Sequence, residues 1–166
     1  MTSQVLSEQA LEVKSFVSLV RAYTHVTRQL NAQLTADHGL TISDYEVLLR
    51  LSRAPDRRLR RVDLAEQVLL TASGITRLLD GLERCGYVER GSCDSDRRVV
   101  YAVLTDDGLA KLRSASTSHV AQIEEYFGSR YDEGELGDLN RLLERAEPSD
   151  PGDCAPPAEP PPPELG

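Results

Sequence analysis

The stretch of sequence that decides the fold is TASGITRLLDGLERCG, from Thr71 to Gly86. Thr71 can cap a helix, because its hydroxyl oxygen accepts a hydrogen bond from a free backbone N–H of the first turn, and Gly86 suits the position just after a helix. Ser73, Thr76 and Arg77 fall on one face, which is typical of a helix that enters the major groove of DNA, where Arg can bind guanine through two hydrogen bonds. Apolar residues recur at helical spacing on the opposite, buried face: Ile75, Leu78, Leu79 and Leu82.

A β-hairpin is predicted directly after this helix. Residues 87–90 and 99–104 are rich in β-branched and aromatic residues, which favour two paired strands. The segment between them, residues 91–98, forms a charged tip that ends in Arg97 and Arg98.

Two helices are predicted before the central one. The nearer helix begins at Arg61 or Val62, although no Ser or Thr precedes it as a cap. The other helix ends at Arg53 and opens with Ser43 as its N-cap and Glu46 three residues later, the pattern of a capping box.

Two helices are also predicted after the hairpin. Thr105 caps the first of them, and its apolar face continues to Phe127. Gly128 and Asp132 mark a break, and a last helix ends near Ala146.

The first predicted helix is the longest, from residue 7 to about residue 37, with Gly39 after its end. A domain of this size cannot bury such a long apolar stripe, so we expect a helix from a second copy of the chain to cover it. The alternative is a helix packed only within its own chain. Apolar residues keep a spacing of three or four along its whole length: Leu11, Phe16, Leu19, Val20, Tyr23, Val26 or Thr27, Leu30 and Leu34.

The net charge of −8 is concentrated at one end of the chain. Residues 132–166 alone carry a net charge of −8, so residues 1–131 are neutral overall. The local distribution of charge, rather than its total, decides whether a surface binds phosphate. Several arginines of the neutral part can form one positive face, the alternative being an ordinary solvated surface: Arg57, Arg58, Arg60, Arg61, Arg77, Arg84, Arg90, Arg97 and Arg98.

Residues 148–166 differ from the rest of the chain. They contain eight of the nine prolines, scattered acidic residues and almost no large apolar residues. Such a segment cannot bury enough apolar surface to offset the entropy of ordering it. We therefore predict a disordered, Pro-rich acidic tail.

Several function classes find no support in the sequence. No apolar run approaches the ~20 residues that span a membrane, and the N-terminus lacks the features of a signal peptide, so we expect a cytoplasmic protein. Cys85, Cys93 and Cys154 form no Cys-x-x-Cys pair, and we expect no metal and no cofactor. The motifs of the common enzyme classes are absent, so we expect no catalytic residues.

A series of short motifs, in order and spacing, resembles the winged helix-turn-helix of the MarR family. The resemblance covers roughly residues 10–146, and it implies a mainly α fold with a small β-hairpin wing. Residues 38–104 would form the DNA-binding region, and residues 1–37 and 105–147 a helical dimerisation layer. The motifs are Leu64-Ala65, Thr76-Arg77-Leu78-Leu79-Asp80, Leu82-Glu83, Gly86-Tyr87-Val88, Asp96-Arg97-Arg98 and Leu104-Thr105.

The resemblance also implies a function, that of a homodimeric regulator of transcription, in most cases a repressor, on a pseudo-palindromic double-stranded DNA operator. In the family pattern a wing carboxylate, here Asp96, pairs with Arg98 and aims it at the minor groove, where an arginine prefers narrow A·T-rich DNA. The residues expected to contact DNA are Thr71, Ser73, Gly74, Thr76, Arg77, Arg97 and Arg98, with Arg58, Arg60 and Arg61 as general phosphate contacts.

A small phenolic or anionic effector is a further implication of the resemblance. Such ligands commonly bind between the dimerisation layer and the DNA-binding region, and by position the lining residues would be Tyr23, His25, Arg28 and Tyr45. Two other functions stay open. One is a winged-helix module that binds proteins, and the other is a thiol-responsive regulator that uses Cys85 or Cys93.

Overall fold

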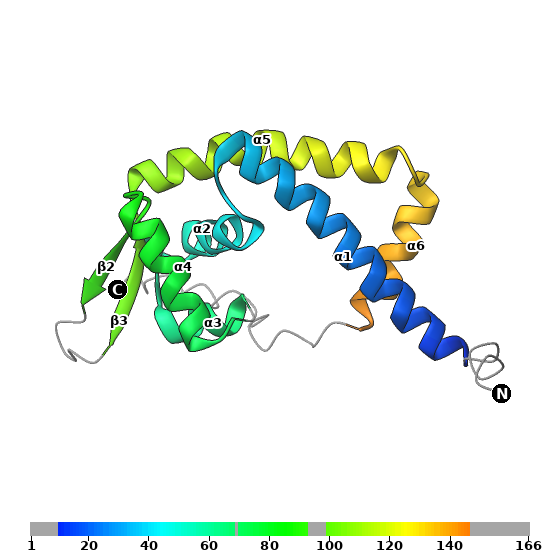
Figure 1. Cartoon of the computed structure of the whole chain (residues 1–166), viewed down its shortest axis with the longest axis horizontal. Helices are drawn as coiled ribbons and strands as arrows, with labels where there is room; N and C mark the ends of the chain where they lie inside the picture. Colours follow the sequence, from blue (N-terminus) through cyan, green and yellow to red (C-terminus); the bar gives the residue numbers. More distant parts are fainter. Residues whose placement is uncertain (1–9, 69, 93–98, 147–166) are drawn as a thin grey trace, which may run out of the picture. The chain divides into compact units, whose positions relative to one another are not determined.

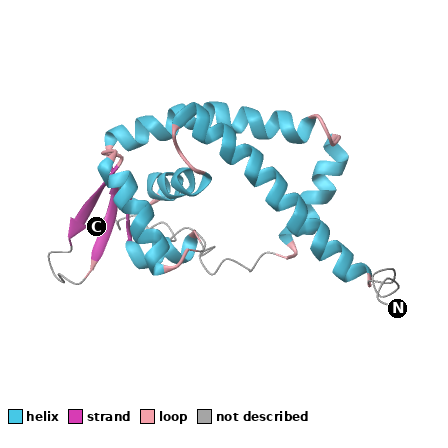
Figure 2. Cartoon of the chain, viewed as in Figure 1, coloured by secondary structure: helices cyan, strands magenta, loops and turns pink. Residues whose placement is uncertain are grey.

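The computed structural model describes residues 10–68, 70–92 and 99–146. The chain divides into two compact units, Met1–Glu125 and Tyr126–Gly166, each of which we describe by itself. Helices dominate and one small antiparallel sheet accompanies them, as the sequence predicted (Figure 2). None of the described helices is long and apolar enough to cross a membrane. The predicted tail, residues 148–166, lies outside the described residues.

The described residues form ten elements in chain order, most of them labelled in Figure 1. They are α1 (Leu11–His38), α2 (Ile42–Arg53), the 3-10 turn η1 (Pro55–Arg57), β1 (Arg58–Arg60), α3 (Arg61–Gln67), α4 (Ala72–Arg84), β2 (Val88–Ser92), β3 (Val100–Leu104), α5 (Asp106–Gly128) and α6 (Glu133–Glu144).

The core of the first unit is built around α2. This helix contacts α1, α4 and β3, so its buried side chains join elements that lie far apart in the sequence. The predicted apolar face of α4 is confirmed, because Ile75, Leu79 and Leu82 are buried and Leu78 packs against the same cluster. The largest fully buried side chains are Leu34, Val47, Leu48, Leu51, Leu64 and Leu79.

The sheet has three antiparallel strands in the order β1-β3-β2: β2 and β3 form the predicted hairpin, and one further strand was not predicted. The missing strand is β1, where Leu59 lies between two charged neighbours and pairs with Ala102 of β3. Three residues with a single apolar member are too short to give a recognisable strand pattern. A pairing partner more than 40 residues away leaves no local signal either.

One predicted helix start was wrong, that of α2. Helix α2 does not begin with the Ser43 and Glu46 box, because the N-cap is Thr41. Its hydroxyl accepts from the N–H of Asp44 at 3.1 Å, and the carboxylate of Asp44 accepts from the N–H of Thr41 at 2.9 Å. Helix α1 begins at Leu11, after Ala10 with an extended backbone (ψ 145°), and its predicted start at residue 7 lies outside the described residues.

The remaining helix ends agree with the sequence. Helix α3 begins at Arg61 without a side-chain cap, and α1 ends before Gly39, whose φ of 64° lies in the left-handed region. The predicted break after α5 is present, with Asp132 as the N-cap of α6 in a capping box.

The first half of α1 is exposed, as expected for a helix that is not covered within its own chain. Phe16 is 66% exposed and Tyr23 is 69% exposed, whereas Leu30 and Leu34 near the other end are buried. The apolar stripe is therefore only partly buried by the described residues.

Replacing Gly108 by alanine should strongly destabilise the fold. Thr105 donates to the carbonyl oxygen of Gly86 at 2.7 Å and accepts from the N–H of Gly108 at 3.0 Å, which holds the first turn of α5 against the turn that follows α4. A Cβ at residue 108 would overlap the carbonyl oxygen of Tyr87. We expect Gly108→Ala to lower the free energy of unfolding by about 2–3 kcal/mol in urea titrations.

The matched control is Gly81→Ala in α4, where no atom lies within 4 Å of the added Cβ. It should raise the free energy of unfolding by about 1 kcal/mol, because alanine favours a helix interior more than glycine does. Equal stability of the two variants would contradict this account of Gly108.

Candidate nucleic-acid interface

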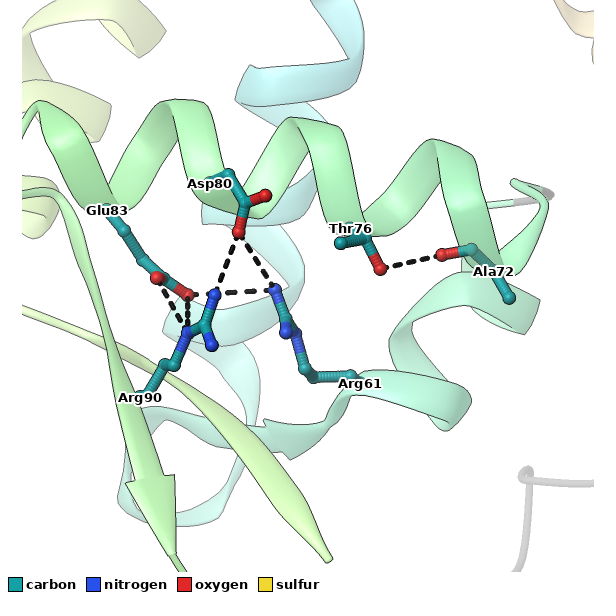
Figure 3. Close-up of polar contacts among 6 residues, drawn as sticks. All are labelled: Arg61, Ala72, Thr76, Asp80, Glu83 and Arg90. Atoms are coloured by element: carbon teal, nitrogen blue, oxygen red, sulfur yellow. Dashed lines mark hydrogen bonds and ion pairs between the residues drawn. The ribbon is translucent and has the colours of Figure 1, made fainter.

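Helix α4 presents a polar face built from short side chains. The hydroxyl of Thr71 accepts from the N–H of Gly74 at 3.1 Å, so the predicted cap is confirmed. Ser73, Thr76 and Arg77 are all exposed, as predicted. The hydroxyl of Thr76 donates to the carbonyl oxygen of Ala72 at 2.8 Å (Figure 3), which leaves the oxygen free to accept and the methyl group free to contact an apolar base edge.

The charges on α4 are segregated along its length. Its first turn contains no acidic residue, so the positive end of the helix dipole is not neutralised there. Arg77 forms no ion pair with any residue that the structure describes. The only acidic residues of the helix, Asp80 and Glu83, lie in its second half. The first half of α4 therefore offers a surface that suits a polyanion.

Four charged side chains form a cluster at the second half of α4 (Figure 3). Arg90 of β2 donates from Nε to the carboxylate of Glu83 at 2.9 Å and from a terminal nitrogen to Asp80 at 2.9 Å. Arg61, the first residue of α3, places a terminal nitrogen 3.8 Å from Asp80 and 3.7 Å from Glu83. The hydrogen bond to Glu83, together with the charges of Glu83 and Asp80, raises the pKa of Arg90 above its ordinary value. We call these four residues the charge cluster.

The three predicted phosphate contacts all have partners within the chain. Arg58 stacks over the ring of Tyr101, with 4.6 Å from its guanidinium carbon to the ring centre. Arg60 donates to Asp63 at 2.7 Å, and this hydrogen bond raises the pKa of Arg60. Arg61 belongs to the charge cluster, and its side chain is only 17% exposed. Whether any of the three contacts phosphate stays a prediction.

The predicted wing contacts lie outside the described residues. These contacts are Asp96, Arg97 and Arg98. Cys93 also lies outside the described residues. The strands β2 and β3 that lead to this tip are described, and they pair in register from Val88 with Leu104 to Ser92 with Val100. Cys85 is exposed at the end of α4.

The four predicted effector residues differ in exposure, and their role stays a prediction. Tyr23, His25 and Arg28 are exposed on α1. Tyr45 is half-buried, with its hydroxyl 3.1 Å from that of Ser116 and its ring edge-on to His119 at 4.8 Å between ring centres. Tyr45 is thus part of the core packing against α5.

One polar group in the core has no local signal in the sequence. The three histidines looked dispersed along the chain, yet the fold brings His38 and His119 close together. His38 Nε2 lies 2.6 Å from the hydroxyl oxygen of Ser118. The next residue, His119, is buried, with its ring edge-on to that of Tyr45. Burial, and then the charge of His38, lower the pKa of His119. Within the described ranges, no three His, Cys, Asp or Glu side chains gather as a metal site would require.

A shallow cavity of about 440 Å³ opens beside the end of α4. No pattern in the sequence predicts this cavity, because its walls come from α1, α2 and α4 and from the turns that follow α1 and α4. The residues that line it include His38, Leu40, Asp44, Leu82, Arg84 and Tyr87.

The arrangement defines a class of protein. The short helix α3 packs against α4, α4 packs on α2 and exposes a polar face, and the antiparallel strands β2 and β3 follow directly (Figure 1). These are the parts of a winged helix-turn-helix, a DNA-binding fold.

Comparisons with known proteins identify the family. The sequence profile of the MarR family matches residues 38–99. The HTH-type transcriptional regulator MhqR of Bacillus subtilis is 30% identical over 140 residues, which cover 84% of this chain and 92% of MhqR. The HTH-type transcriptional repressor YetL of Bacillus subtilis is 34% identical over 114 residues, covering 65% of this chain and 68% of YetL.

A solved structure gives the same result. Sco3205, a MarR family transcriptional regulator from Streptomyces coelicolor crystallised in complex with DNA, is 32% identical and has a TM-score of 0.74. The match covers 86% of this chain and 91% of Sco3205. The chain belongs to the MarR family, and it is a transcriptional regulator with a winged helix-turn-helix.

Acidification should destabilise the protein through His119. The unfolded chain binds the imidazole proton near pH 6.5, whereas the lowered pKa means that the folded chain binds it only at lower pH. The unfolded state therefore holds more protons in this window, and the free energy of unfolding falls as the pH drops below about 6.5. The other titratable groups that face this part of α5 are Asp37 and His38 at the end of α1 and Tyr45 of α2.

The measurement is thermal unfolding of the wild type and of His119→Leu between pH 8 and pH 5. The variant should lose less stability than the wild type over this range, because only the wild type must protonate a buried ring. Parallel curves for the two proteins would show that His119 does not contribute.

Proposed function

We propose that this regulator acts as a homodimer that binds a pseudo-palindromic DNA operator and represses transcription from it. The observation that carries the proposal is the exposed polar face of α4, opposite an apolar face whose residues Ile75, Leu79 and Leu82 are buried. A recognition helix needs this combination, because the buried face fixes its orientation while the exposed face reads the bases.

The surface of α1 supports the dimer. Large apolar side chains are exposed along its first half, among them Leu11, Phe16 and Tyr23. A contiguous apolar stripe of this kind is uncommon on a monomeric protein. The same stripe on a second copy can cover it through a two-fold axis.

A two-fold dimer sets the geometry of DNA binding. The two α4 helices would enter successive major grooves ~34 Å apart, which matches two half-sites of a pseudo-palindrome. The two wings would flank them, with Arg97 near phosphate and Arg98, oriented by Asp96, in the minor groove. Sco3205 was crystallised with DNA, and YetL is named as a repressor, which supports the same role here by similarity.

We also propose control by a small anionic or phenolic effector. The cavity beside the end of α4 is a suitable site, because Arg84 and His38 line it together with apolar side chains. A ligand there would touch the recognition helix directly. It would release DNA only if it binds the DNA-free conformation more tightly than the DNA-bound one.

The proposed function is tested by the affinity for DNA from upstream of the protein's own gene, compared with random duplex of equal length. Arg77→Ala should reduce the preference for the operator by about tenfold or more, because a paired arginine–guanine contact contributes ~1–3 kcal/mol of discrimination. Affinity for random duplex should change much less.

The control is Arg141→Ala in α6, where Arg141 forms an exposed ion pair with Asp138. This change should leave both affinities as they are, because an exposed pair contributes little. The proposal fails if the wild type binds the upstream DNA no more tightly than random duplex.

A further inference from the structure

The charge cluster joins three elements of the DNA-binding region. Asp80 and Glu83 lie three residues apart on α4, so their side chains project from the same side of the helix. Arg61 reaches them from the start of α3, and Arg90 reaches them from strand β2 (Figure 3). Two cations from different elements therefore meet two carboxylates of the recognition helix.

The four side chains of the charge cluster differ in how much they are exposed to solvent. The side chain of Arg61 is 17% exposed and that of Glu83 is 22% exposed, whereas Arg90 is 57% exposed and Asp80 is 46% exposed. One terminal nitrogen of Arg61 is buried and makes no hydrogen bond to a described residue. An arginine that is largely buried beside two carboxylates is badly placed to reach a phosphate.

We infer that Arg61 and Arg90 are positioning residues, which lock α3 and strand β2 to the recognition helix so that the helix and the wing strands meet DNA as one unit. The inference rests on the proposed function, because it concerns how the same DNA-binding surface is held. Arg61, predicted from the sequence as a phosphate contact, would instead hold α3 against the recognition helix.

The geometry of Arg90 supports this role. Its guanidinium bridges both carboxylates with hydrogen bonds at 2.9 Å, and a bridging guanidinium fixes direction as well as distance. Arg90 lies in β2 two residues after Val88, which is buried in the core, so movement of the strand is restrained at both points.

Electrostatics supply a second contribution. Asp80 and Glu83 are the acidic residues of a helix that approaches a polyanion. Two arginines beside them make the cluster neutral overall, which removes a repulsion between α4 and the phosphates.

The decisive test is the sign of the effect when the carboxylates lose their charge. In the double variant Asp80→Asn and Glu83→Gln, Arg61 and Arg90 keep their charge but lose their carboxylate partners. If they are positioning residues, operator affinity should fall by about tenfold, because residues in one ion-pair network are coupled. If they are phosphate contacts, the variant should bind more tightly, because two arginines are released and two negative charges are removed.

A second variant keeps the test independent of folding effects in the double variant. Arg61→Met preserves the length and the apolar part of the side chain. If Arg61 is a positioning residue, Arg61→Met should weaken operator binding and leave the slope of log affinity against log salt unchanged. A slope that becomes shallower by about 0.9 would mean a lost phosphate contact and would overturn the inference.

Controls separate the possible failures. Thermal unfolding of each variant without DNA shows whether it is folded at the temperature of the binding assay, and Asp138→Asn in the exposed pair of α6 should leave operator affinity unchanged. If the wild type shows no preference for the upstream DNA, the proposed function fails. If the wild type binds specifically and both cluster variants bind as tightly as the wild type, this inference fails alone.

Discussion

The structure depends on the packing of one helix face. Ile75, Leu79 and Leu82 of α4 are buried against the core around α2, and this contact determines which side of α4 faces outward. At ~1.5–3 kcal/mol for each fully buried large apolar side chain, no surface contact of the region can compete with it. Because a helix is rigid, fixing one face also fixes the exposed positions of Ser73, Thr76 and Arg77. The reading surface is thus a consequence of the core.

Polar contacts then refine what the core has placed. Thr71 fixes the start of α4, Thr105 ties its end to the start of α5, and the charge cluster joins its outer side to α3 and β2. The most buried charge among them, Arg61, lies beside two carboxylates, because an unpaired buried charge is costly. These contacts act at the edges of the helix, where small changes in angle would matter most for a fit to the groove.

Much of this fold could be predicted because its signals are local. The period of the apolar residues and the Thr71 cap lie within one turn or one helix, so residues 71–86 were assigned correctly. Strand β1 could not be predicted, because its pairing with β3 joins distant segments. The cap of α2 was predicted two residues too late, at Ser43, because Ser43 with Glu46 matches the capping-box pattern as well as Thr41 with Asp44 does. The partners of Arg61 lie 19 and 22 residues away on another helix. Its place in the charge cluster could therefore not be predicted from the neighbouring arginines in the sequence.

The central claim is that two copies of the chain present two α4 helices to two half-sites of one operator. Hydroxyl-radical footprinting of the wild type on DNA from upstream of its own gene tests this most directly. The account predicts two symmetric protected regions whose centres lie about one helical turn, ~34 Å, apart. The same experiment with Phe16→Asp, which places a charge in the exposed stripe of α1, should lose both regions together. A single protected region, or protection spread evenly along the duplex, would contradict the account.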